Sequence, residues 1–135
     1  MSDQSSSLDP KVVQAFVGSA HGDLDTVREL LAAEPALVNA AWDWGAGDWE
    51  TGLGAAAHMG RRDIAFYLID RGARMDLFAA AMLGDVEVVR SVLEAYPAMA
   101  GALGPHGIPL VEHARVEGEE AREVLALLES AEVRG

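Results

Sequence analysis

Residues 51–73 read TGLGAAAHMGRRDIAFYLIDRGA, a pattern that predicts two short helices joined by a tight turn at Gly60. Ile64 and Leu68 recur at helical spacing and give the second helix one apolar face. Gly60 and Gly72 stand where the chain leaves a helix and needs a positive φ angle. Because one such helix pair cannot bury its own apolar face, the pattern is expected to recur along the chain.

The pattern recurs in residues 15–31 and 77–93, and in a weaker form in residues 109–128. In each copy an apolar helix is followed by a turn glycine and then by an amphipathic helix. The turn glycines, at positions 22, 60, 84 and 118, have a mean spacing close to a period of roughly 33 residues. Stacked copies of this kind would bury one continuous core.

The repeated pattern resembles the ankyrin-repeat family, whose motif is Thr-Pro-Leu-His-x-Ala-Ala-x-x-Gly, followed by Val-x-x-Leu-Leu and Gly-Ala. The motif positions kept here are Thr51, Leu53, Ala56, Ala57, Gly60, Gly72 and Ala73 in the second copy, Leu77, Ala80, Ala81, Gly84, Val89 and Leu93 in the third, and Pro109, Leu110 and Ala114 in the fourth. The family's His position is filled instead by Phe16, Gly54, Phe78 and Val111. The resemblance implies an all-α solenoid of helix-turn-helix repeats and a non-catalytic, protein-binding function.

We expect a single domain over residues 9–131, with repeats near 9–41, 51–75, 76–100 and 108–131. The Ser-rich residues 1–8 are expected to form a disordered tail. Residues 42–50 interrupt the repeats and are expected to form one long, Trp-rich finger loop, in which Gly45 and Gly47 suit a reversal of the chain. Asp9 and Asp76 are predicted to be helix N-caps.

The composition is acidic and free of cysteine, with a net charge of −12 from 22 acidic and 10 basic residues. This charge repels nucleic acid and anionic lipid, and it either favours a basic partner or serves solubility alone. The lack of cysteine excludes disulfide bonds and cysteine-ligated metals. No apolar run approaches the roughly 18 residues of a membrane span, and no signal-peptide pattern opens the chain. The expectation is a cytoplasmic monomer.

All three tryptophans lie in or beside the finger, where acidic residues are interleaved with them; the set is Trp42, Asp43, Trp44, Asp48, Trp49 and Glu50. One hypothesis is an aromatic, acidic cage for a cation, such as an Arg- or Lys-bearing peptide or a quaternary ammonium group. The other is that the tryptophans pack the finger against its own repeat. The two hypotheses are compatible for different tryptophans.

His21, His58 and His113 hold related positions at the ends of the first helices of their repeats. In ankyrin-like proteins these positions face a concave groove, which here would be lined by His21, His58, Met59, Met82, Leu83 and Arg115. The alternative is that the histidines cap helix C-termini by bonding the last carbonyls. A metal site needs further ligands, and Asp23 is the only nearby candidate in the sequence. We therefore expect no metal ligand, no cofactor and no catalytic residue.

The expected function is that of a protein–protein interaction module, which binds a basic partner through the groove and the finger. One alternative is a small-molecule or cation-binding protein, or an enzyme, that uses the corner formed by the tryptophans with His21 and His58. A closed pocket at that corner would favour a ligand, and an open groove would favour a protein. A further alternative is a scaffold that only spaces other proteins.

Overall fold

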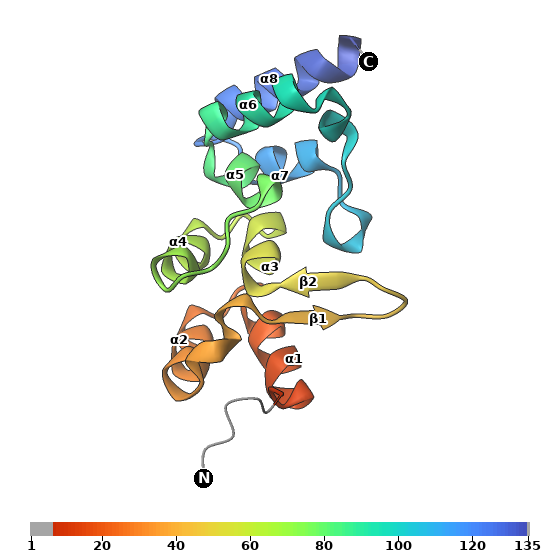
Figure 1. The fold of residues 1–135 in the computed structure, drawn as a ribbon. Helices are drawn as coiled ribbons and strands as arrows, with labels where there is room; N and C mark the ends of the chain where they lie inside the picture. The colour runs from red at the N-terminus through yellow and green to blue at the C-terminus, as the bar shows by residue number, and fades with distance from the viewer. Residues whose placement is uncertain (1–6, 135) are drawn as a thin grey trace.

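The computed structural model describes residues 7–134, and within them the fold is mostly helical, with eight α-helices and one two-stranded sheet (Figure 1). The helices are α1 (Pro10–Ser19), α2 (Leu24–Ala33), α3 (Gly52–His58), α4 (Arg62–Asp70), α5 (Leu77–Leu83), α6 (Val86–Ala95), α7 (Leu110–Glu117) and α8 (Arg122–Arg134). Three 3₁₀ turns join them, η1 (Pro35–Asn39), η2 (Pro97–Gly101) and η3 (Pro105–Gly107). This confirms the predicted all-α class. In the described range, none of the helices has both the length and the apolar character needed to cross a bilayer.

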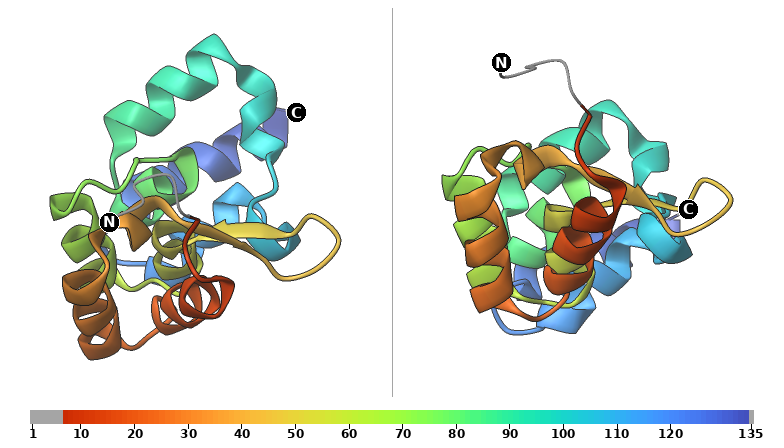
Figure 2. Two further views of the ribbon diagram at one scale, coloured as in Figure 1. Left: turned by 60° about the horizontal axis from the view of Figure 1, so that its bottom comes forward. Right: turned by 90° about the horizontal axis from the view of Figure 1, so that it is seen from below.

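The odd-numbered helices form an inner row, in which α1 contacts α3, α3 contacts α5, and α5 contacts α7. Figures 1 and 2 show α2 and α4 together on one side of this row. Close stacking is possible because the facing side chains are small: Ala55 to Ala57 in α3 and Ala79 to Ala81 in α5 are all fully buried. The alanine runs therefore allow neighbouring helices to approach closely.

The apolar side chains form two cores. The first joins α1 to α4 with Ala79 and Met82 of α5, and Leu8 packs against it. The second joins α5 to α8. Residues 1–6 of the predicted tail lie outside the described residues. Met82 is fully buried, so its expected place on an exposed groove was wrong: α5 is covered on both sides by α3 and α7.

The predicted finger is a β-hairpin that projects from the side of the inner row opposite α2 and α4 (Figures 1 and 2). Strands β1 (Ala41–Asp43) and β2 (Trp49–Thr51) pair in antiparallel register, with Trp42 opposite Glu50. The Asp43 carboxylate accepts the backbone N–H groups of Gly45 and Gly47, so this side chain shapes the turn. Since side chains alternate along a strand, Trp49 and Glu50 point to opposite faces.

The helix starts follow the predicted capping chemistry. The carboxylate of Asp9 accepts the backbone N–H of Lys11 at 2.9 Å, and Asp76 accepts that of Ala79 at 2.8 Å. Asp23, the one acid that the sequence offered as an extra metal ligand, caps α2 by accepting the N–H of Thr26. These caps satisfy backbone donors that the first helical turn leaves unpaired.

Replacing Gly84 with alanine should destabilise the fold by about 2 kcal/mol. Gly84 ends α5 with a φ of 81°, and a Cβ atom there would overlap the backbone carbonyl of Glu120. Gly101→Ala is the control, since an added Cβ meets open space there, and its effect should stay within about 0.5 kcal/mol. Urea denaturation compares the two variants, and equal stabilities would contradict the close approach at Gly84.

Candidate metal centre

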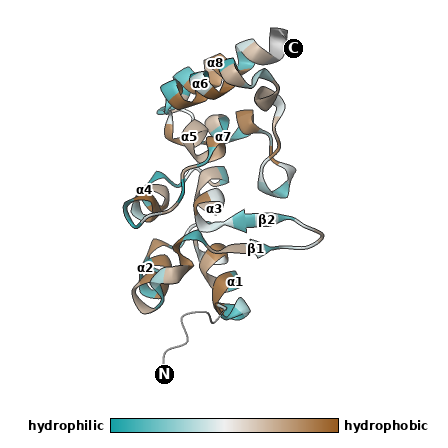
Figure 3. Ribbon diagram, in the orientation of Figure 1, coloured by the Kyte–Doolittle hydropathy of each residue, from teal (hydrophilic) through white to brown (hydrophobic). Residues whose placement is uncertain are grey.

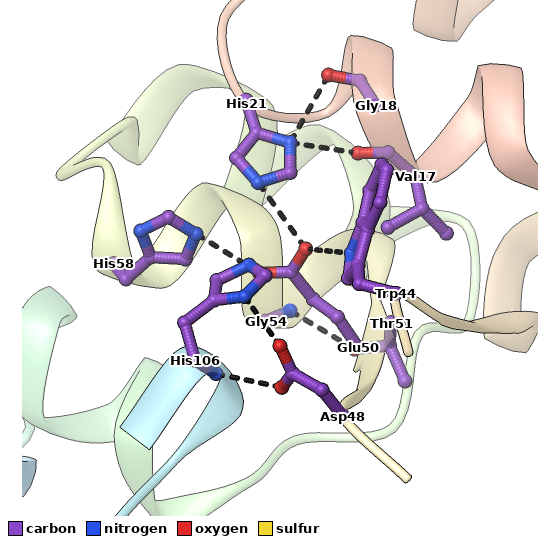
Figure 4. Close-up of polar contacts among 10 residues, drawn as sticks. All are labelled: Val17, Gly18, His21, Trp44, Asp48, Glu50, Thr51, Gly54, His58 and His106. Carbon is purple, nitrogen blue, oxygen red and sulfur yellow. Dashed lines mark hydrogen bonds and ion pairs between the residues drawn. The ribbon is translucent and has the colours of Figure 1, made fainter. Parts of the chain in front are cut away.

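Three histidines surround one buried carboxylate at the base of the hairpin (Figure 4). The Nε2 atom of His21 lies 3.2 Å from Oε1 of Glu50, while the Nε2 atoms of His58 and His106 lie 2.9 Å and 3.3 Å from Oε2. One ligand atom from each of the four residues lies within 4.8 Å of all the others. We call these four residues the His–Glu cluster. It places four groups with metal-binding chemistry around one point.

Each ligand is delivered by a different segment. His21 follows the end of α1 and His58 is the last residue of α3, so the stacking of two inner helices brings the imidazole rings to 5.0 Å between centroids. Glu50 comes from β2, the hydrophilic strand in Figure 3, and its side chain is nevertheless completely buried. His106 comes from η3, which leads into α7. The cluster therefore depends on the tertiary fold.

Hydrogen bonds on the far side of two rings determine where their protons lie. The Nδ1 atom of His21 is 3.0 Å and 3.1 Å from the carbonyl oxygens of Val17 and Gly18, so it donates and must carry a proton. This matches the predicted bond to the last carbonyls of a helix. The Nδ1 atom of His106 likewise donates to Asp48 Oδ2 at 2.7 Å. Neutral rings in these tautomers direct their Nε2 lone pairs at the carboxylate of Glu50.

Lone pairs that face a carboxylate repel it unless a positive charge lies between them. That charge is supplied either by protonated rings or by a metal ion. The ordered partners favour the ion, because metal-binding histidines characteristically donate their other N–H to a carboxylate or a backbone carbonyl. The pairs His106–Asp48 and His21–Val17 are of these two kinds.

Two atoms of the cluster are left without a hydrogen bond. Oε2 of Glu50 and Nε2 of His58 are both buried and lie 2.9 Å apart, yet they form no hydrogen bond of normal geometry. Unsatisfied buried polar atoms are rare because they cost free energy. Tetrahedral Zn²⁺ with bonds of 2.0–2.1 Å places neighbouring ligand atoms about 3.3 Å apart. The distances from the Glu50 carboxylate to the three Nε2 atoms, 2.9 Å, 3.2 Å and 3.3 Å, are close to this spacing, so one ion would satisfy both atoms.

The hairpin also orients the carboxylates. The indole Nε1 of Trp44 donates to Oε1 of Glu50 at 2.9 Å. Asp48 accepts the backbone N–H of His106 at 2.8 Å as well as the ring N–H. This hydrogen bond supports the hypothesis that Trp44 packs within the finger. Trp42 is half-buried against the first core, whereas Trp49 is 60% exposed.

The surroundings keep both carboxyl groups ionised. Burial alone would raise the pKa of Glu50, but its close contacts with His58, His21 and the indole of Trp44 together lower it. The pKa of Asp48 is lowered chiefly by the backbone N–H of His106. Burial alone would lower the pKa of His106, but the contacts with Asp48 and Glu50 raise it. The Glu50 carboxylate is therefore ionised and faces a cation, either a protonated imidazole or a metal ion.

The other predicted contact residues are dispersed. Met59 is 46% exposed, and Leu83 is half-buried against the first core. Arg115 pairs with Glu112 and Glu129 on α7 and α8. Glu50, predicted to touch a partner, is fully buried, so that prediction was wrong. Its burial follows from the hairpin register, which turns Glu50 toward the helix ends.

One histidine that was expected near His21 and His58 lies elsewhere, and a different histidine lies there instead. His113, expected beside His21 and His58, is buried in α7 next to Phe78, and its Nδ1 donates to the carbonyl of Pro109. His106 takes its place in the cluster. His106 was not predicted to be a site residue, although its position in a Pro-His-Gly turn immediately before the fourth helix pair was a signal in the sequence.

His113 should make the metal-free protein sensitive to acid. Burial lowers its pKa, so the unfolded chain takes up a proton near pH 6.5 while the folded chain stays neutral. Stability then falls as the pH drops below about 6.5, with a slope of up to about 1.4 kcal/mol per pH unit from this residue. His113→Leu should remove this slope. The Pro109 carbonyl is not left without a hydrogen bond in this variant, because it still accepts the backbone N–H of Glu112. Urea denaturation in EDTA at pH 7 and pH 5 gives the change in the free energy of unfolding for each protein. An equal change in the wild-type protein and in His113→Leu would contradict the prediction.

Comparison with known proteins adds no relative. No protein-family model matches this chain, and neither a curated protein nor a solved structure matches it. The geometry of the side chains, above all that of the His–Glu cluster, is therefore what indicates a function.

Proposed function

We propose that this protein binds one divalent transition-metal ion, with His21, Glu50, His58 and His106 as its ligands. The observation that carries the proposal is the convergence of three Nε2 atoms and one buried carboxylate. Three imidazoles and one carboxylate suit Zn²⁺ and similar ions, whereas Mg²⁺ and Ca²⁺ prefer oxygen ligands. Since four protein ligands fill a tetrahedral ion, the proposed role is structural or regulatory rather than catalytic.

The repeated sequence pattern and the stacked helix pairs support a finer description of the fold. We propose that the four pairs are ankyrin-like repeats arranged as a solenoid. In this description the His–Glu cluster lies where the ends of two inner helices meet the long finger. The ion would then hold the finger against the repeats that it joins.

Zn²⁺ titration of the EDTA-treated, dialysed protein, followed by calorimetry, tests the proposal. We expect one site per chain and no comparable heat from Mg²⁺. His58→Ala should weaken Zn²⁺ binding more than about 100-fold, because losing a ligand exceeds the 10–100-fold effect typical of an outer-shell partner. Met59→Ala is the matched control, since it changes the next residue, whose side chain is exposed. Absent binding, or binding that His58→Ala leaves unchanged, would overturn the proposal.

The protein-interaction function remains a second candidate, now with a smaller surface. The exposed apolar side chains of Trp49 and Met59 support it, and the net charge of −12 favours a basic partner. His21 and His58 are directed at Glu50 instead. A partner surface would therefore lie on the outer face of the hairpin and the turn after α3.

A further inference from the structure

We infer that the bound ion acts as a latch, which fastens residues 102–109 onto the hairpin and so controls the position of this segment. We call the segment the His106 loop. The inference rests on the proposed metal binding and goes beyond it, because it states what occupancy changes in the protein. The ligands come from both halves of the molecule, few contacts hold the tip of the loop, and His106 is the most exposed ligand.

The four ligands come from the two halves of the molecule. His21 and His58 end helices whose apolar residues belong to the first core, and Glu50 lies in the hairpin beside them. The His106 loop belongs to the other half, because it leads directly into α7, whose Leu110 and Val111 lie in the second core. One ion in the cluster would therefore join the two halves at a point separate from the packing of α3 against α5.

The base of the loop is packed, since Gly104 lies against Phe78 and Pro105 lies near Gly54, but few contacts hold its tip. Leu103 is 65% exposed, so it does not anchor the loop by apolar burial. Asp48 bonds the backbone and the ring of His106, but both side chains are 31% exposed, and partly exposed ion pairs contribute little to stability. His106 itself has a φ of 62°, a left-handed conformation that is unfavourable for a residue other than glycine. The tip of the loop is therefore held mainly by Asp48 when no ion is bound.

The exposure of the ligands also indicates how an ion enters. The side chain of Glu50 is completely buried and that of His58 is 10% exposed, whereas those of His21 and His106 are 26% and 31% exposed. The cluster is therefore accessible from the side where His21 and the His106 loop face each other. An ion would meet His21, Glu50 and His58 first, and His106 would close over it as the last ligand.

Hydrogen exchange of the full-length protein tests the latch, with and without saturating Zn²⁺. The probes are amides whose bonds define the loop, those of Gly104, His106 and Ile108. We expect Zn²⁺ to slow exchange in a peptide covering residues 103–109 at least ~10-fold, since bonds that open locally are the ones that a ligand can protect. A peptide from α6 is the internal control and should not change.

The matched variant is His106→Asn, which removes the imidazole while tolerating the left-handed backbone. It should bind Zn²⁺ more weakly through the three remaining ligands, and saturating Zn²⁺ should leave its loop exchange unchanged. If circular dichroism shows that this variant does not fold, His106→Gly replaces it, because glycine adopts the same φ freely.

The outcomes separate the two proposals. If the wild-type protein binds no Zn²⁺, the proposed function fails and the latch fails with it. If one Zn²⁺ binds but exchange in residues 103–109 does not slow, the latch is overturned while the metal site stands. Equal protection in the wild-type protein and in the His106 variant would also overturn the latch.

Discussion

Glu50→Gln is expected to weaken Zn²⁺ binding by more than about 100-fold while the protein stays folded. Glutamine has nearly the same shape, and its side-chain oxygen can still accept the indole N–H of Trp44, which donates to Glu50 at 2.9 Å. The amide is neutral, however, so the ion loses its one anionic ligand. Calorimetric titration measures the affinity, and far-ultraviolet circular dichroism confirms the helix content.

A matched control separates this effect from the general acidity of the chain. Glu87→Gln removes the same charge from α6, where Glu87 is exposed and paired with Arg90. Its Zn²⁺ affinity should equal that of the wild-type protein within about threefold, because charges separated by water are screened. If Glu50→Gln bound Zn²⁺ as tightly as Glu87→Gln, Glu50 would not be a ligand.

Met82→Asp is expected to unfold the protein or to destabilise it by more than about 4 kcal/mol. Met82 is fully buried in the first core, and an aspartate there would place an unpaired carboxylate among apolar side chains. Met59→Asp makes the same chemical change at a side chain that is 46% exposed, and it should leave the melting temperature nearly unchanged. Thermal melts followed by circular dichroism compare the two, and a normally folded Met82→Asp would show that this site is not buried.

Local features of the fold could be predicted because they depend on neighbours in the sequence. Asp9 and Asp76 cap helices through backbone groups two and three residues away. Gly60 adopts a positive φ of 66°, as a turn at a helix end requires. The finger was predicted from the glycines and tryptophans of residues 42–50, although its hairpin register was not.

The His–Glu cluster could be predicted only in part. His21 and His58 come together because they occupy equivalent positions in successive helix pairs, which a repeated sequence reveals. The burial of Glu50 contradicts the usual exposure of glutamate, and it follows from a strand register that the sequence does not specify. His106 joins the cluster because the chain folds back after α6. Met82 was wrongly predicted to be exposed, because its burial also depends on tertiary packing: α5 lies between α3 and α7.

The position of α5 between the two cores determines where the chain can tolerate change. Ala79 and Met82 pack in the first core, while Ala80 and Ala81 pack in the second. A larger side chain in this short helix would push against both neighbours at once, so no single compensating change could relieve it. At the hairpin tip, in contrast, the space around Gly45 and Gly47 is open within 4 Å of an added Cβ, and only their positive φ angles of 140° and 84° disfavour other residues at these two positions. Random mutagenesis followed by selection for folded protein should therefore leave α5 nearly invariant, whereas the tip should accept insertions and attached labels.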